Sequence, residues 1–340
     1  NTWEKSFQGS VDAVISLADN DNCRLDERVN DIFKEIAGFA TVITVQIGET
    51  LQNEAGLHIE HFGYVDGISQ PLFLADKIAA EKLKHGDDGW KSEAPLKLVL
   101  VKDPLGDQET SAGSYCVYRK LEQDVKGFKQ KEAELAEAIN SKNEGVDLTS
   151  DQAGALAMGR FRDGTPVTSF FQPQGAAEPD NSFIYSSDRT GDRDGLKCPL
   201  QSHVRKTNPR FDSVKNVGVG SLADTKEDEL KHRIVRRGIP FGQKGESSVG
   251  LIFICFQANI GKQFEFMQFA WGNNKNFVVN DTGVDPIIGQ HVSGNTQKWK
   301  MWNRPDSNAA EFDMSNFVKM QGGEYFFAPS ITFLTHINDK

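Results

Sequence analysis

The sequence lacks the features that would place it in a membrane or on nucleic acid. No stretch reaches eighteen consecutive apolar residues, so we expect no transmembrane helix. The 38 lysines and arginines are scattered among 48 acidic residues, and a net charge of −10 without a basic stripe argues against nucleic acid as a partner. No secretory signal opens the sequence, so we favour a cytoplasmic location; the start at Asn1 rather than Met leaves secretion open.

Cysteine is also scarce, and its spacing excludes two common kinds of site. The chain has four cysteines that form no Cys-x-x-Cys pair, namely Cys23, Cys116, Cys198 and Cys255. This spacing indicates neither a zinc site nor a redox dithiol and favours free thiols in the core. His58 and His61 have a metal-like spacing, but no third ligand lies nearby in the sequence, so loop histidines are the simpler interpretation.

The apolar pattern predicts alternating strands and helices in the first third of the chain. Alternation predicts strands at residues 11–17 and 41–47, and apolar residues three and four apart predict a helix at 25–36. Residues 96–101 are a further strand candidate. At 340 residues the chain is long enough for two domains or one large one.

The pattern then restarts, which indicates two related α+β halves, residues 1–108 and 109–340. The second half is predicted to hold a strand at 114–118, an amphipathic helix over 121–139, a buried strand at 250–256 and a helix at 264–271. Between them, residues 163–200 are rich in Gly, Pro, Asp and Ser, as expected of a long loop that wraps a site.

Three short blocks could carry chemistry. In the first, Gly63 and Gly67 bracket Asp66 and let the backbone approach whatever the carboxylate faces, although a simple turn also explains this pattern. In the second, residues 198–210, a histidine precedes two arginines, which suits a haem whose iron takes an axial histidine and whose propionates take guanidinium groups. The third, residues 232–242, is a basic segment with buried-type apolar residues. A structural histidine and a solvated charge cluster are the competing interpretations.

Taken together, the three blocks resemble the dye-decolourising peroxidase family of haem proteins. The resemblance lies in Gly-x-x-Asp-Gly with Ser-Gln-Pro at 63–71, in CPxxxHxRKTNPR at 198–210 and in RRGIPxG at 236–242. Weaker similarities lie at 159–166, 283–289 and 322–330. The resemblance implies an α+β fold of two ferredoxin-like halves of the dimeric α+β barrel type, with antiparallel sheets and helices. It also implies one haem b per chain, seated mainly in the second half. Fewer residues precede Asp66 than in longer members, so an edge strand of the first half is expected to be missing.

The family resemblance also implies roles for individual residues. Asp66 and Arg236 would form the catalytic pair above the haem, and His203 would be the axial ligand of its iron. Other residues at the cofactor would be Arg205 and Arg210 at the propionates, Gly67 and Ser69 in the Asp66 block, Leu251 and Phe253 in the distal pocket, and Asp285 hydrogen-bonded to His203. Asp281 competes with Asp285 for that last role.

The implied function is a peroxidase that reduces hydrogen peroxide through an oxyferryl radical and oxidises dyes, phenols and similar one-electron donors. Because a free Asp titrates near ~3.9, we expect optimum turnover at roughly pH 3 to 5.5. The alternative is a haem-, porphyrin- or iron-handling protein with little peroxidase turnover, which would need His203 but not Asp66 with Arg236. A homo-oligomer is compatible with the sequence.

Two further positions bear on substrate oxidation. Trp271 stands where some members carry a surface tryptophan that passes electrons to bulky dyes, with helix packing as the competing interpretation. Phe241 stands where some members carry a tyrosine, and phenylalanine cannot form a phenoxyl radical. Residues 218–223 imitate a dinucleotide-binding motif but follow a polar segment rather than a buried strand, so no dinucleotide is expected.

Overall fold

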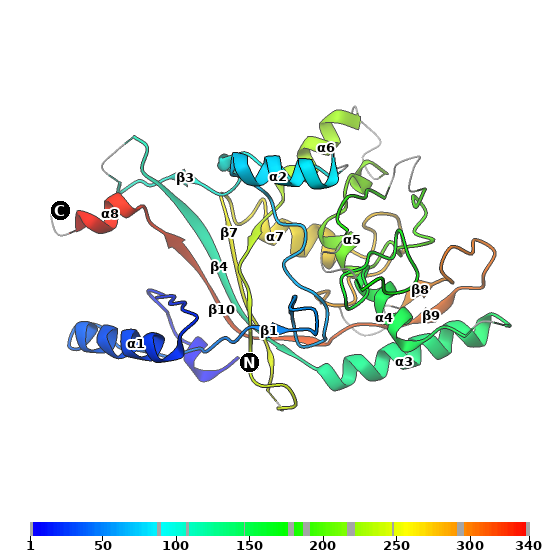
Figure 1. Ribbon diagram of the computed structural model, residues 1–340, viewed down its shortest axis with the longest axis horizontal. Coiled ribbons are helices and arrows are strands. Elements are labelled where there is room, and N and C mark those ends of the chain that lie inside the picture. The colour runs from blue at the N-terminus through cyan, green and yellow to red at the C-terminus, as the bar shows by residue number, and fades with distance from the viewer. Residues whose placement is uncertain are drawn as a thin grey trace.

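A six-stranded antiparallel sheet forms the centre of the computed structural model (Figure 1), in the order β10-β4-β7-β5 with β3 on β4 and β6 on β7. The structure describes residues 3–86, 90–106, 109–145, 147–175, 180–185, 191–215, 222–246, 248–290 and 296–337. The strands of this sheet are β3 (Val101–Lys102), β4 (Ala112–Gln123), β5 (Val235–Arg236), β6 (Ile239–Phe241), β7 (Gly250–Gln257) and β10 (Val318–Ala328). Two small antiparallel pairs join β1 (Leu51–Gln52) to β2 (His58–Ile59) and β8 (Gln297–Trp299) to β9 (Ala310–Phe312).

The helices lie around this sheet and at its ends (Figure 1). They are α1 (Asn22–Ile36), α2 (Ala75–His85), α3 (Val125–Lys142), α4 (Ser150–Met158), α5 (His203–Thr207), α6 (Leu222–Lys231), α7 (Phe264–Phe266) and α8 (Ile331–Thr335). The π-helix η4 (Met267–Gly272) follows α7 directly. Short 3₁₀ turns are η1 (Lys5–Phe7), η2 (Leu96–Leu98) and η3 (Asp212–Lys215). The protein is therefore an α+β protein with antiparallel sheets, as the sequence predicts.

The largest core cluster holds α3 and α4 against β8 and β9. Phe128, Leu135 and Ile139 repeat at helical spacing on α3 and are fully buried, and they pack in one cluster with Leu156 of α4 and Trp299 of β8. A capping box of Thr149 and Gln152 starts α4, and the left-handed Gly159 ends it. This ending matters for function, because the next residue in the chain is an arginine that lines a cavity.

Several elements agree with the sequence prediction. The helix at 25–36, the strand at 114–118 and the strand at 250–256 are confirmed as α1, β4 and β7. The helix predicted from 121 starts at Val125, because β4 continues to Gln123. The predicted helix at 264–271 is a short α-helix that continues as a π-helix.

Two predicted strands are wrong. Residues 11–17 and 41–47 carry no regular secondary structure, and in the described part of the chain they pair with no strand. Alternating apolar and polar residues indicate only which side chains share a face. A strand also needs a neighbouring strand whose backbone forms hydrogen bonds with its own N–H and C=O groups. The strand predicted at 96–101 is a 3₁₀ turn followed by the two residues of β3.

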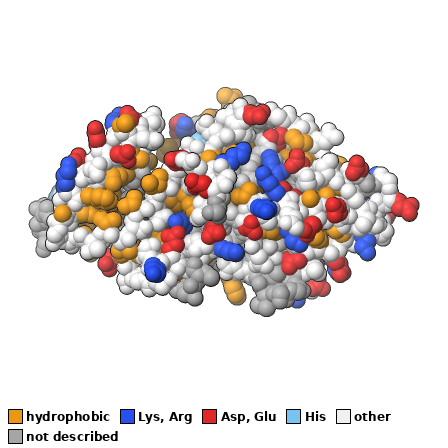
Figure 2. Space-filling model, turned by 90° about the horizontal axis from the view of Figure 1, so that it is seen from below, with side chains coloured by type: hydrophobic (Ala, Val, Ile, Leu, Met, Phe, Trp, Pro, Cys, Tyr) orange, Lys and Arg blue, Asp and Glu red, His pale blue; other side chains and the backbone are white. Residues whose placement is uncertain are grey.

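The same region leaves apolar side chains in contact with solvent. α1 has no buried residue, and large exposed apolar side chains gather around it, namely Val14, Ile15, Phe33, Phe39, Val42, Ile43, Val45 and Ile47. Figure 2 shows apolar side chains gathered on the side of the molecule where α1 lies. Apolar side chains that gather in this way differ from the single exposed apolar residues that are normal on a protein surface.

The division into residues 1–108 and 109–340 stays a prediction. Residues 107 and 108, at the predicted boundary, lie outside the described residues. So do residues 218–221 of the sequence that imitates a dinucleotide-binding motif. Of the helices in the described ranges, none has both the length and the apolar character that crossing a bilayer requires.

Candidate functional site

A cavity of about 250 Å³ brings together residues from distant parts of the chain. Its wall is formed by the loop at residues 60–71, by β4 and β7 of the sheet, by α5 and by the segment from α7 to η4. Most of the lining side chains are apolar. Six predicted site residues line it, namely Asp66, Ser69, His203, Arg236, Leu251 and Phe253.

His203 is the first residue of α5 and is oriented by a buried carboxylate. Its Nδ1 lies 2.9 Å from Oδ2 and 3.2 Å from Oδ1 of Asp285, which is fully buried. Oδ1 of Asp285 also accepts the backbone N–H groups of Ile287 and Ile288, at 2.8 and 3.0 Å. In a neutral imidazole whose Nδ1–H donates to this fixed carboxylate, Nε2 is the nitrogen that is available to a metal. Asp281 is exposed and makes no contact of this kind, so Asp285 is the partner.

Asp66 and Arg236 form an ion pair at the same cavity. Nη1 of Arg236 donates to Oδ1 of Asp66 at 3.0 Å, and Nη2 donates to the carbonyl of Ile68 at 2.7 Å. Both side chains are about one third exposed, so the pair is open to small molecules that enter the cavity. Arg236 lies on β5, and its backbone N–H donates to the side chain of Gln70. The guanidinium group of Arg236 thus connects the Asp66 loop to β5 at the edge of the sheet.

The backbone of the Asp66 loop explains its glycines. Gly63 and Gly67 have positive φ angles of 94° and 84°, a conformation that residues with a Cβ rarely adopt. The N–H of Gly67 donates to Oδ1 of Asp66 at 2.6 Å, and the N–H of Asp66 donates to the carbonyl of His58 in β2. Ser69 also has a positive φ of 65°, an unusual backbone for a non-glycine residue that is often found at functional sites.

Two buried arginines meet beside the cavity. Arg160, which the sequence analysis did not select, lines the cavity directly, and Arg210 donates to the hydroxyl of Ser69 at 3.0 Å. Both guanidinium groups donate to the same side-chain oxygen of Asn181. Burial lowers the pKa of Arg160 to about 10 and that of Arg210 to about 9. Within the described residues, no ion pair is made by either group, and Nε of Arg210 has no hydrogen-bond partner.

This arrangement is suited to an anionic ligand, although both guanidinium groups also donate to backbone carbonyls. Two guanidinium groups that form no ion pair within the described residues are costly to bury, and a negatively charged ligand at Ser69 and Arg160 would offset that cost. The predicted position of Arg210 at an anionic group is therefore compatible with the structure. The sequence signal for Arg160 is the Gly-Arg-Phe-Arg-Asp-Gly segment at 159–164, which is one of the weaker similarities to the peroxidase family.

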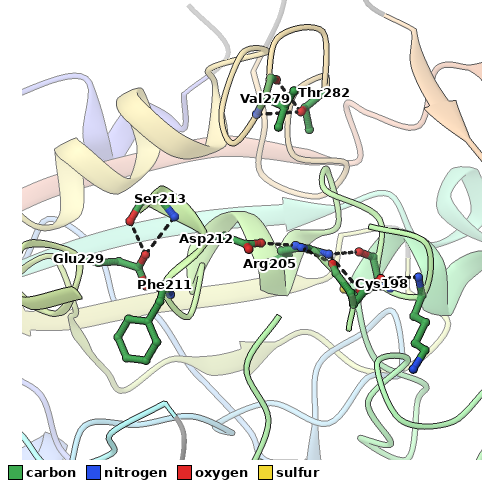
Figure 3. Close-up of polar contacts among 10 residues, drawn as sticks. Cys198, Arg205, Phe211, Asp212, Ser213, Glu229, Val279 and Thr282 are labelled. Atoms are coloured by element: carbon green, nitrogen blue, oxygen red, sulfur yellow. Dashed lines mark hydrogen bonds and ion pairs between the residues drawn. The ribbon is translucent and has the colours of Figure 1, made fainter. Parts of the chain in front are cut away.

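Arg205 does not reach the cavity, and its predicted role at a propionate is not supported. It is fully buried, with Nε donating to Asp212 at 2.5 Å and Nη1 donating to Asp192 at 3.0 Å and to the carbonyl of Cys198. Figure 3 shows this arginine between Asp212 and the loop at Cys198. The guanidinium group also lies 4.2 Å from the ring centre of Tyr185. Its nitrogen atoms are thus used to hold the loop after residue 191 against α5.

Leu251 and Phe253 lie on β7 with the two-residue spacing that puts both side chains on one face of the sheet. Leu121 of β4 pairs with Leu251 in the strand register and lines the same cavity. The ring of Phe253 contacts Phe264 at the start of the helical segment, with 5.9 Å between centroids. These residues make one side of the cavity apolar.

Trp271 is not a surface residue, so its prediction as a surface electron-transfer site is wrong in that respect. It lies in η4 with 5% of its surface exposed, and its ring stacks on Phe277 at 5.4 Å. His232 and Phe266 contact it edge-on at 5.4 and 5.5 Å. Packing, the competing interpretation, accounts for these contacts.

One further acidic residue at the cavity was missed. Glu60 precedes the Asp66 loop and accepts the backbone N–H groups of Phe62 and Tyr64 at 2.9 and 3.0 Å. Gln123 of β4 also donates to it. Burial raises the pKa of Glu60 to about 7. A glutamate within a loop gives no sequence signal for such burial.

Comparisons with known proteins identify the family of the chain. A family model described as "Dyp-type peroxidase, C-terminal" matches residues 84–278. The multifunctional dye peroxidase DyP2 of Amycolatopsis sp. is 38% identical over 98% of this chain and 72% of its own length. The dye-decolorizing peroxidase AauDyP1 of Auricularia auricula-judae is 30% identical over 98% of this chain and 66% of its own length. The crystal structure of an Anabaena sp. DyP-type peroxidase superimposes with a TM-score of 0.90 at 43% identity, covering 98% of this chain and 70% of that chain.

These findings define the class of the protein. It is an oxidoreductase with a ferredoxin-like α+β fold, and within that class it is a peroxidase that acts on dyes. The chain belongs to the Dyp-type peroxidase family, whose members are haem-dependent.

The residues around the cavity fit a haem. An imidazole with one free nitrogen can ligate iron, an apolar wall can contact the macrocycle, and the two buried arginines can meet its carboxylates. Among the described residues, no group of three or more His, Cys, Asp or Glu side chains could hold a metal ion by itself. The pair His58 and His61 is used differently, since Nε2 of His61 contacts the carbonyl of Phe241 at 2.8 Å.

Proposed function

We propose that this protein binds one haem b in the cavity, where His203 would hold the iron, and uses it to reduce hydrogen peroxide. One observation carries the proposal: the His203–Asp285 pair and the Asp66–Arg236 pair border a single, mostly apolar cavity. Haem supplies the two electrons that reduce the peroxide. The hydrogen bond to Asp285 increases the electron-donating character of the imidazole, which favours oxidised iron.

Asp66 is proposed as the group that moves the proton. Its carboxylate takes a proton from one oxygen of the peroxide and delivers it to the other, which leaves as water. Oδ1 is held by Gly67 and Arg236, so the second oxygen is the one left to exchange a proton. Arg236, fixed by the Ile68 carbonyl, stabilises the negative charge that develops as the O–O bond breaks.

The other contacts position the cofactor and select what enters. Arg160 and Arg210 are proposed to hold the haem propionates, together with Ser69, which accepts a hydrogen bond from Arg210. Leu251 and Phe253 are proposed to keep the peroxide side narrow and apolar. The reducing substrates we propose are aromatic dyes and phenolic one-electron donors, in line with the names of the relatives.

The test is stopped-flow absorbance of haem-loaded wild type, Asp66→Asn and the exposed control Asp281→Asn on mixing with hydrogen peroxide. Removing a proton-transfer group typically costs about 10² to 10⁴-fold, so Asp66→Asn is expected to slow the Soret change by about that factor. Asp281→Asn is expected to match wild type. Wild type that binds haem without reacting with peroxide would favour the haem- or iron-handling alternative. Equal rates in all three proteins would remove Asp66 from the mechanism.

A further inference from the structure

Tyr64 lies in the wall of the cavity and is not used by the proposed peroxide chemistry. It stands two residues before Asp66 and is 3% exposed. Its hydroxyl donates a hydrogen bond of 2.8 Å to Oε1 of Glu132, a buried residue of α3. The phenol in the cavity wall is thus hydrogen-bonded to a carboxylate that does not line the cavity.

Glu132 belongs to a chain of charged groups that continues to the surface. Nη2 of Arg162 donates to both oxygens of Glu132, at 2.8 and 2.6 Å, and Nη1 donates to Asp151 at 2.5 Å. The side chain of Glu132 is 3% exposed, that of Arg162 is 28% exposed and that of Asp151 is 71% exposed. A proton received by Glu132 therefore has charged neighbours that lead to solvent.

The electrostatics of this cluster favour loss of an electron from Tyr64 only when its proton leaves too. The guanidinium group of Arg162 lies 4.9 Å from the ring centre of Tyr64, and a cation over the ring opposes the formation of a positively charged phenol. Burial and the nearby Glu132 raise the pKa of Tyr64 well above its ordinary value, so the resting group is a neutral phenol. Burial also raises the pKa of Glu132, which makes its carboxylate a stronger base than one in water.

We propose that Tyr64 is a redox-active tyrosine, with Glu132 as its proton acceptor. One electron passes from the phenol to a haem that hydrogen peroxide has oxidised, and the O–H proton passes to Glu132. The phenoxyl radical that results takes one electron from a reducing substrate small enough to enter the cavity that Tyr64 lines, and Glu132 returns the proton. Each cycle leaves Tyr64 unchanged and transfers one electron from the substrate. This inference rests on the proposed function, because the electron acceptor is the haem at His203.

Of the five tyrosines of the chain, all within the described residues, Tyr64 is the one that lines the cavity. Tyr118 and Tyr185 are buried and do not line the cavity, and no carboxylate accepts a hydrogen bond from either hydroxyl within the described residues. Tyr325 does donate to a carboxylate, Glu265, but it is 41% exposed and lies outside the cavity wall. Tyr118 is therefore the matched control, a buried tyrosine of the central sheet.

The experiment uses haem-loaded wild type, Tyr64→Phe and Tyr118→Phe, mixed with one equivalent of hydrogen peroxide without a reductant. Samples are frozen within milliseconds for electron paramagnetic resonance, and the Soret band is followed in parallel. We expect a tyrosyl signal in wild type and Tyr118→Phe that falls at least fivefold in Tyr64→Phe. A signal equal in all three proteins, or no tyrosyl signal in wild type, would overturn the role of Tyr64.

The two measurements separate this proposal from the one it rests on. A Soret change in all three proteins with no loss of the tyrosyl signal rejects Tyr64 alone, whereas no Soret change in wild type rejects the peroxidase site. The role of Glu132 is tested in wild type, so that a misfolded variant cannot obscure it. The growth of the tyrosyl signal after the Soret change is complete is expected to be at least about twofold slower in D₂O than in H₂O, since the proton moves with the electron in that step. An unchanged rate would overturn proton transfer to Glu132.

Discussion

Replacing Asp285 by asparagine tests the proximal side of the site. The substitution keeps the shape of the side chain and the acceptor oxygen that the N–H groups of Ile287 and Ile288 hold, but it removes the negative charge next to Nδ1 of His203. A hydrogen bond to a charged group contributes about 1.5–3 kcal/mol and a neutral one about 0.5–1.5 kcal/mol. The difference, about 1–2 kcal/mol, favours the more positive state of the iron.

This free energy converts directly into a redox potential. For a one-electron couple a tenfold change, or about 1.4 kcal/mol, corresponds to about 59 mV. We therefore expect the ferric/ferrous midpoint potential of Asp285→Asn to lie about 40–85 mV above that of wild type. The sign is positive because the charge of Asp285 stabilises ferric iron.

The assay is a spectroelectrochemical titration of haem-loaded wild type, Asp285→Asn and Asp281→Asn. Asp281 is the exposed acidic residue four positions earlier, and its replacement is expected to move the potential by less than about 15 mV, because solvent screens its charge. Equal potentials in wild type and Asp285→Asn, at equal haem content, would refute the argument. Equal shifts in both variants would also refute it, because a general loss of negative charge would then explain the result.

Three other predictions concern stability and substrate oxidation. Burial raises the pKa of Glu229 to about 7. The contribution of Glu229 to stability is therefore fully present below pH 4.5 and is lost as the pH rises through 7. When the pH is raised from 5 to 8, the Tm of Glu229→Gln should fall by a few degrees less than that of wild type in scanning calorimetry. An equal loss in both proteins would contradict this. Phe128→Ala removes a fully buried ring from the core of α3 and should lower the free energy of unfolding by about 3–5 kcal/mol in urea titrations. Trp271→Phe should keep its oxidation rate with bulky dyes, because the indole is buried; a large loss of that rate with small phenols unaffected would restore the electron-transfer role.

The residues of the catalytic cavity could largely be predicted from the sequence, because their motifs are local. Asp66 depends on two glycines within four positions, and His203 and Arg236 stand in equally compact blocks. Asp285 was also identified, with Asp281 as its rival. Burial decides between those two, and burial is a property of the folded chain rather than of spacing.

Other parts could not be predicted, because they depend on contacts between distant residues. Arg205 stands in the same block as His203, but its ion pairs with Asp192 and Asp212 direct it away from the cavity. The spacing along α5 did not reveal this. In residues 11–17 and 41–47, apolar and polar residues alternate as they do in β-strands. Within the described residues neither segment has a neighbouring strand to pair with, so neither forms a strand.

The two buried arginines affect how much folded protein a cell can maintain. Arg160 and Arg210 donate hydrogen bonds to the same side-chain oxygen of Asn181. Without an anionic ligand, burial of their two positive charges lowers the free energy of unfolding. A ligand that binds only the folded form and is present at a thousand times its Kd adds about 4 kcal/mol of stability. The amount of this protein is therefore expected to follow the supply of haem. Cells short of the cofactor would make the chain and then lose it to proteolysis, since degradation follows the population of the unfolded form.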